Sequence, residues 1–178
     1  YDNDVRGRLA FTADGVAVPI VLAATGPRMT RTAARIGDGV IVHQGLSPDL
    51  VGRAVGWVRD GLAEVVPKDF EVSCWAPYSL GADAAEARDR VRARVAGALM
   101  NAQPDWFEGA ERAAVERLKR GYDIHHHASA APDHAAGVPD SLVDRYALAG
   151  VAEDVAERLA RLLDQPGIDR VILTPQVI

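Results

Sequence analysis

Cysteine is almost absent from this sequence of 178 residues, in which Cys74 is the single example. One cysteine cannot form a disulfide within the chain, and such a chain is typical of a reducing compartment. We therefore expect a cytoplasmic protein. Cys74 is also a weak candidate for a nucleophile, because it lies inside an alternating apolar stretch with nothing nearby to lower its pKa.

The sequence also lacks long apolar runs and an excess of positive charge. No apolar stretch approaches the length that spans a membrane, and a net charge of −5 gives no reason to expect nucleic acid or an anionic membrane as a partner. Apolar residues make up 48% of the chain and charged residues 25%, a balance typical of a globular domain. The length predicts one domain, residues 1–178.

The clearest pattern in the chain lies between residues 18 and 43. Apolar runs with β-branched residues predict buried strands over 19–23 and 39–43. Between them, Thr25 is a candidate N-cap, Pro27 stands near the first helical position, and apolar residues then recur at helical spacing. Strand, short helix and strand in this order predict a parallel pair with a right-handed crossover.

This unit has a chemical consequence at the turn before the helix. Free backbone N–H groups and the helix dipole at Pro27 favour an anion, most often a phosphate. Gly26 allows close approach of a ligand to the backbone, and Arg28 would add a positive charge with a fork of donors. The alternative is that Gly26 and Pro27 only make a turn and that Arg28 is a solvated side chain.

Periodicity predicts the remaining elements. Alternation predicts a strand over 70–75, an apolar run predicts one over 170–174, and residues 9–11 could make a further short strand. Apolar residues three and four apart predict amphipathic helices over 48–62, 84–100, 106–120, 141–150 and 155–163. The outer face of the second helix in this list carries four arginines, which we interpret as a solvated face with local ion pairs.

Four of the five histidines lie between residues 122 and 139, a segment without a clear period. Three of them are consecutive, at 125–127, and consecutive side chains do not face one centre on regular structure. Since no cysteine or carboxylate spacing accompanies them, we expect no bound metal. The fifth, His43, follows a predicted strand and is the candidate for a proton-transfer role, with a structural histidine as the alternative.

Two stretches carry a resemblance to a known family. The run AATGPRMTRTAARIGDGVIV, residues 23–42, resembles the central signature of the bacterial luciferase-like flavin and deazaflavin oxidoreductases. Residues 142–174, LVDRYALAGVAEDVAERLARLLDQPGIDRVILT, are similar to the C-terminal segment of that family. The resemblance is greatest to the branch that uses the deazaflavin coenzyme F420, typified by methylenetetrahydromethanopterin reductase.

The resemblance implies an α/β fold, the second half of an eight-stranded (β/α)8 TIM barrel. On this mapping, four parallel strands near Ile20, Ile41, Val72 and Ile172 are the fifth to eighth barrel strands, with flanking helices and a helical insertion before the last strand. A complete barrel usually needs about 250 residues. We therefore expect residues 1–178 to be a fragment, the C-terminal half of such a barrel.

The same resemblance implies the site residues. Residues holding the phosphate-bearing tail of the coenzyme would be Thr25, Gly26, Arg28 and Met29. Since active sites of these barrels lie at the C-terminal ends of the strands, residues expected to face the substrate are His43, Trp75 and, from a loop over the mouth, His126. The catalytic residue is not identified, with His43 as the candidate.

The resemblance also implies the chemistry. We expect an oxidoreductase in which a hydride passes between F420 and an unknown organic substrate, with a small molecule as the substrate and a homodimer kept as a prediction. Two alternatives stay open: an FMN-dependent monooxygenase of the same architecture, and a non-catalytic paralogue that binds a phosphate ligand.

Overall fold

The computed structural model describes residues 18–123, 125 and 133–176. In this part the chain forms five strands: β1 (Val21–Ala24), β2 (Gly39–Val42), β3 (Glu71–Leu80), β4 (Leu148–Gly150) and β5 (Arg170–Pro175). The α-helices are α1 (Gly26–Ile36), α2 (Pro48–Leu62), α3 (Ala84–Leu99), α4 (Gly109–Gly121), α5 (Asp140–Tyr146) and α6 (Ala152–Leu163). Two 3-10 helices are η1 (Pro104–Trp106) and η3 (Asp133–Gly137).

All strand pairs in the sheet are parallel, as predicted from the sequence. β1 pairs with β2, and β2 pairs with the first half of β3. β5 pairs with β3 over Ser73 to Tyr78, so it occupies the opposite edge of β3 from β2. β4 pairs with the last three residues of β3 on the same edge as β2, beyond the end of that strand. The four predicted strands are confirmed, and β4 is an addition.

β3 is longer than the sequence predicted. The expected strand ended at Trp75, whereas β3 continues through Pro77 to Leu80. Proline favours the end of a strand because it donates no hydrogen bond to a ladder. Here Tyr78 and Leu80 gain a partner strand in β4, which keeps the chain extended. Trp75 therefore lies in the middle of β3, and not at its end.

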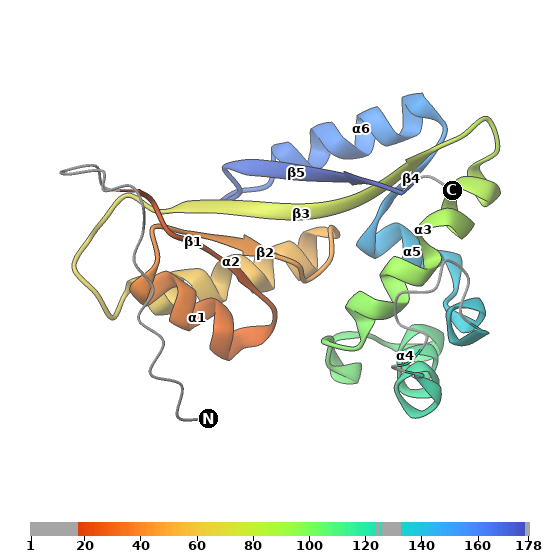
Figure 1. The fold of residues 1–178 in the computed structure, drawn as a ribbon, viewed down its shortest axis with the longest axis horizontal. Helices are drawn as coiled ribbons and strands as arrows, with labels where there is room; N and C mark the ends of the chain where they lie inside the picture. Colours follow the sequence, from red (N-terminus) through yellow and green to blue (C-terminus); the bar gives the residue numbers. More distant parts are fainter. Residues whose placement is uncertain (1–17, 124, 126–132, 177–178) are drawn as a thin grey trace, which may run out of the picture.

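The helices cover one face of the sheet. Val40, Val42, Val72, Cys74 and Ala76 pack against α1, α2 and α6 in one apolar cluster. Because side chains alternate along a strand, the intervening residues of β2 and β3 point to the other face of the sheet. Figure 1 shows α1 and α2 along β1 and β2, and α6 along β5.

A second apolar cluster fills the helical insertion between β3 and β5. It joins the inner faces of α3, α4 and α5, with Val91, Val115 and Leu142 fully buried. In Figure 1 these helices gather at the far end of β3, away from α1. The helix expected over 106–120 begins at Gly109 instead, because Pro104 starts a separate 3-10 turn. No described helix is both long and apolar enough to cross a membrane.

The N-terminal ends of the strands are closed by a repeated device. Asp38, just before β2, donates its backbone N–H to Ile20 O at 2.8 Å, and its Oδ2 accepts the Ile20 N–H at 2.8 Å. Asp169, just before β5, makes the same pair of bonds to Val72, at 2.9 and 2.8 Å. Each aspartate therefore fixes where its strand starts relative to an earlier strand.

The two outer strands of the sheet have no partner on their far edges among the described residues. Their side chains are correspondingly open: Val21 in β1 is 41% exposed and Leu173 in β5 is 42% exposed. The strand expected at 9–11 lies outside the described residues.

Candidate active site

The turn between β1 and α1 forms an open cradle at the C-terminal end of β1. Gly26 has a φ of 76°, which glycine adopts without strain, and a Cβ placed there would meet nothing within 4 Å. Thr25 is extended and makes no side-chain cap. Because the N–H groups in the first turn of a helix have no intrahelical acceptor and Pro27 has no N–H, the turn offers the backbone donors of Gly26 and Arg28 to a ligand.

The side chains of this turn support the cradle. Thr30 is fully buried and its Oγ1 donates to Gly26 O at 2.9 Å, which holds the turn in place. Arg28 is exposed and has no ion pair with any described residue, and Met29 is 56% exposed. The structure thus brings together the four residues predicted to hold the coenzyme tail, while their role stays a prediction.

A second group of side chains lies on the face of the sheet away from the helices. The rings of His43 and Trp75 are tilted against each other with centroids 4.1 Å apart. The Trp75 Nε1–H donates to Thr174 Oγ1 in β5. His43 follows β2, so three neighbouring strands contribute to this group, which we call the mouth cluster: His43, Trp75 and Thr174.

The imidazole of His43 is neutral at neutral pH. Burial lowers its pKa from an ordinary value of 6.5 to about 4, and the positive charge of Arg94 acts in the same direction. Its Nε2 is buried without a partner among the described residues, as is the side-chain nitrogen of Gln44. The sequence suggested a histidine near its ordinary pKa; the structure instead favours a neutral group that accepts or donates a hydrogen bond.

Arg94 is the residue of this site that the sequence analysis missed. It belongs to α3, is exposed, and its guanidinium lies 5.7 Å from the centroid of the Trp75 ring. From the sequence, all four arginines of this helix were expected on a solvated face. A signal was available in the spacing, because Arg94 lies six residues after Arg88 and so points away from it by more than a right angle on a helix.

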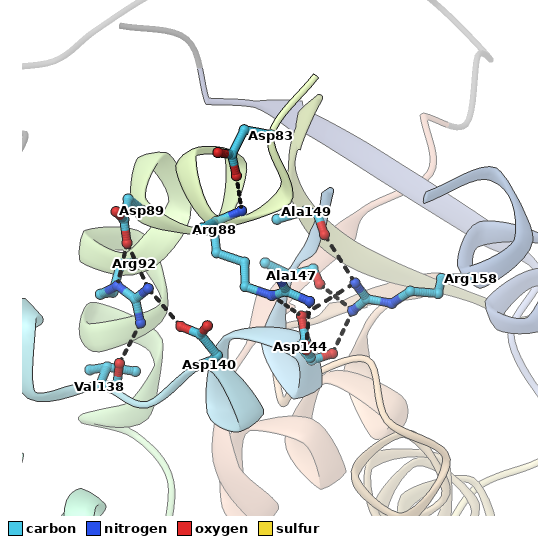
Figure 2. A network of polar contacts seen from close by, with 11 residues as sticks. Asp83, Arg88, Asp89, Arg92, Val138, Asp140, Asp144, Ala147, Ala149 and Arg158 are labelled. Atoms are coloured by element: carbon cyan, nitrogen blue, oxygen red, sulfur yellow. Dashed lines mark hydrogen bonds and ion pairs between the residues drawn. The ribbon is translucent and has the colours of Figure 1, made fainter. Parts of the chain in front are cut away.

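A polar network holds α3 in place. Arg88 makes two bonds to Asp144 of α5, at 2.9 and 3.2 Å. Arg92 bonds Asp140 at the start of α5 at 2.7 Å and also bonds the carbonyl of Val138. Figure 2 shows both arginines reaching from α3 to α5. These bonds fix the helix that carries Arg94.

The same network reaches α6 through Arg158. Its guanidinium donates to the carbonyl oxygens of Asp144 and Ala147 at 2.6 Å and of Ala149 at 3.3 Å. In Figure 2 these acceptors converge on Arg158 from the end of α5 and from β4. Since carbonyls at a helix end otherwise lack partners, Arg158 satisfies them and attaches α6 to the insertion.

Cys74 and His125 do not join the site, and His126 cannot be placed relative to it. Burial raises the pKa of Cys74 to about 12, so its thiol stays protonated. His125 is exposed, and His126 lies outside the described residues, so its predicted contact with substrate stays untested. Within the described ranges no three His, Cys, Asp or Glu side chains are grouped so as to hold a metal.

Parallel strands alternating with outer helices, with an open turn after β1 and the mouth cluster on the neighbouring strands, are the arrangement of an α/β-barrel enzyme. The model of the luciferase-like monooxygenase family matches residues 3–170, and the chain belongs to this family. The family and fold predicted from the sequence are thereby confirmed.

Curated relatives are 5,10-methylenetetrahydromethanopterin reductases. That of Archaeoglobus fulgidus is 27% identical over 97% of this chain and 53% of its own length. That of Methanolobus tindarius is 30% identical over 88% of this chain and 48% of its own length. The chain spans about half the length of these relatives.

A solved structure has the same fold. It is the coenzyme F420-dependent tetrahydromethanopterin reductase from Methanopyrus kandleri, with a TM-score of 0.65 and 22% identity. The match covers 89% of this chain and 45% of the other.

Proposed function

We propose that this chain is part of an F420-dependent oxidoreductase acting on a small organic molecule. The observation that carries the proposal is the open cradle at Gly26 after β1, together with the mouth cluster that begins at the end of the neighbouring strand β2. The proposal is supported by the reductase names of the curated relatives and by membership of the luciferase-like family.

The cradle fits a phosphate group. Its free backbone donors and the α1 dipole favour an anion, and Arg28, which has no ion pair within the described part of the chain, can approach one. The space in front of Gly26 is empty of protein atoms within 4 Å of a built Cβ. These residues would hold the phosphate-bearing tail of the coenzyme, and Met29 would cover it.

The mouth cluster would orient the substrate. When bound, the deazaflavin supplies hydride transfer to or from carbon. Trp75 offers an apolar face that is fixed by its bond to Thr174, so a substrate can lie flat against a rigid surface. The neutral His43 would hold a hydrogen bond to a substrate oxygen through its Nε2, to which no described residue bonds.

The domain assignment belongs to the same proposal. We infer that residues 1–178 form the C-terminal half of a (β/α)8 barrel, because β1, β2, β3 and β5 make four parallel strands whose outer edges have no partner among residues 18–123, 125 and 133–176. The missing strands would supply the rest of the coenzyme pocket. A cytoplasmic location and a homodimer are further predictions.

Spectroscopy of the complete protein with each coenzyme tests the function. Binding of F420 with reversible bleaching of its absorbance in the presence of substrate supports the proposal. Oxygen consumption with reduced FMN would favour a monooxygenase, the alternative that fits the EDTA monooxygenase among proteins of similar fold. Binding of F420 without turnover of any tested alcohol or pterin would favour a non-catalytic relative.

A pair of glycine variants tests the cradle. Gly26→Asn places a side chain where the phosphate is proposed to lie, and asparagine tolerates a positive φ. Gly109→Asn is the matched control, because Gly109 also begins a helix with a positive φ of 52° and open space around its Cβ. We expect at least tenfold weaker F420 binding in the first variant and unchanged binding in the second.

Removing the charge beside the cradle tests the second contact. Arg28→Ala should weaken F420 binding about ten- to hundredfold, because a hydrogen bond to a charged group is worth about 1.5–3 kcal/mol. If Gly26→Asn and Arg28→Ala both fold and bind F420 like the parent protein, the phosphate is held elsewhere.

A further inference from the structure

One arginine of α3 differs from the others on the same helix. Arg88, Arg90 and Arg92 each make an ion pair with a carboxylate. Arg94 makes no ion pair and no hydrogen bond with any described residue, and its guanidinium lies over the ring of Trp75. An arginine without a carboxylate, resting on an aromatic ring, keeps its planar fork of donors available to a ligand.

Its place in the fold makes this arginine part of the mouth. The Trp75 ring lies tilted against His43 and is bonded to Thr174, so the guanidinium lies next to the cluster that faces away from the outer helices. The effect of Arg94 on the titration of His43 agrees with this proximity. Arg94 therefore adds a positive charge beside the mouth cluster, none of whose three residues is an acid.

The helix that carries Arg94 is held in position by the ion pairs of its neighbours. Figure 2 shows Arg88 and Arg92 fixing α3 to α5. The guanidinium of Arg94 rests on the Trp75 ring, 5.7 Å from its centroid. Preorganised donors bind an anion more tightly than mobile ones, because less freedom is lost on binding.

We propose that Arg94 binds a carboxylate or phosphate group of the substrate, so that the substrate of this protein is an anion. The inference rests on the proposed function in one respect, because it takes the mouth cluster as the place of the substrate. The coenzyme phosphate is assigned to the cradle at Gly26, which lies at the end of β1, two strands away from Trp75 in β3. Arg94 is thus available for the anionic group of the substrate.

Titration of the complete protein with simple anions tests the binding site directly. The probes are succinate and inorganic phosphate at constant ionic strength, followed by tryptophan fluorescence. Arg94→Gln removes the charge, Arg94→Lys keeps it without the fork, and Arg120→Gln removes an exposed charge from α4 as a control. We expect saturable binding that is at least tenfold weaker in Arg94→Gln, intermediate in Arg94→Lys, and within twofold of the parent in Arg120→Gln.

Three results would overturn the inference. They are no saturable signal in the parent protein, equal affinity in Arg94→Gln, or the same loss in Arg120→Gln. The Arg94 side chain is exposed, so the variant should keep its melting temperature within about 4 °C. If Arg94→Gln melts at a lower temperature than this, Arg94→Lys is compared with the parent protein instead. An affinity of Arg94→Lys for succinate and phosphate equal to that of the parent protein would count against bidentate binding by Arg94.

A coenzyme titration separates the two sources of the anion. Arg94→Gln should bind F420 within twofold of the parent protein. A tenfold loss would mean that Arg94 holds the coenzyme, and the inference about the substrate would be wrong. If the parent protein binds no F420 at all, the proposed function fails, while the succinate and phosphate titrations still decide whether Arg94 is an anion site.

Discussion

The buried histidine at the mouth should make stability depend on pH. His43 has its pKa lowered to about 4, first by burial and then by the charge of Arg94. Above pH 6.5 its imidazole is neutral in both the folded and the unfolded chain, so the group does not affect stability there. Between pH 6.5 and 4 the unfolded chain takes up a proton that the folded chain does not, so stability falls as the pH falls.

The size of the effect follows from the two pKa values. The gap between 6.5 and about 4, at roughly 1.36 kcal/mol per pH unit, corresponds to a loss of about 3 kcal/mol over this range. Below pH 4 the folded chain is protonated as well, and the loss stops growing. Since carboxylates titrate in the same acidic range, the effect of His43 must be measured against a variant that lacks only this group.

Urea unfolding of the parent protein and of His43→Gln, each measured from pH 4 to 7.5, isolates the contribution of His43 to the free energy of unfolding. The difference in unfolding free energy between the two should change by about 3 kcal/mol across the range, in favour of the variant at low pH. NMR titration of the imidazole C–H signals gives the pKa itself. Arg94→Gln should raise the pKa of His43 only part of the way towards 6.5, because burial is the larger cause.

A His43 signal that titrates between pH 6 and 7 would refute this reasoning. So would a difference in unfolding free energy between the parent protein and His43→Gln that does not vary with pH. Either result would return the imidazole to its ordinary pKa and would make a protonated general acid at neutral pH available to the reaction.

Two further predictions concern stability. Asp169→Ala should lower the free energy of unfolding in urea by about 1–3 kcal/mol, because the part-buried Val72 N–H loses its 2.8 Å acceptor. Asp164→Ala, a change at an exposed position, is the control and should alter stability by about 0.5 kcal/mol or less. Equal effects of the two substitutions would contradict the role of Asp169. EDTA should leave the melting temperature unchanged, because the described residues contain no three-ligand group and histidines 125–127 have no metal-ligand spacing; a drop that zinc reverses would contradict it.

Much of the fold could be predicted from the sequence. The strands at 39–43 and 170–174 agree with β2 and β5 to within a residue, because apolar runs between turn residues are a strong signal. β4 could not be found in this way. It has three residues, ends in Gly150 and exists only because β3 offers it an edge, which is a tertiary effect without a periodic pattern.

The site was predicted less completely than the fold. The turn at Gly26 has a local signature of small residues followed by proline, so its residues were identified together. The contact between His43 and Trp75 depends on the register of two strands, and it follows from the parallel order once that order is known. Arg94 depends on how α3 is docked by ion pairs more than forty residues away in the chain, and the sequence alone does not specify that docking.

The twin aspartates beneath the sheet have a consequence for how this architecture can be diversified. Asp38 closes its unit across 18 residues, from Ile20, and Asp169 closes its unit across 97, from Val72, with the same two bonds. The same pair of hydrogen bonds therefore forms whether few or many residues separate the aspartate from its partner. The segment from α3 to β4 could therefore be replaced by another insertion while the starts of the strands keep their relative positions. For protein design, the end of β3 and the start of α6 are therefore suitable points at which to join a different insertion.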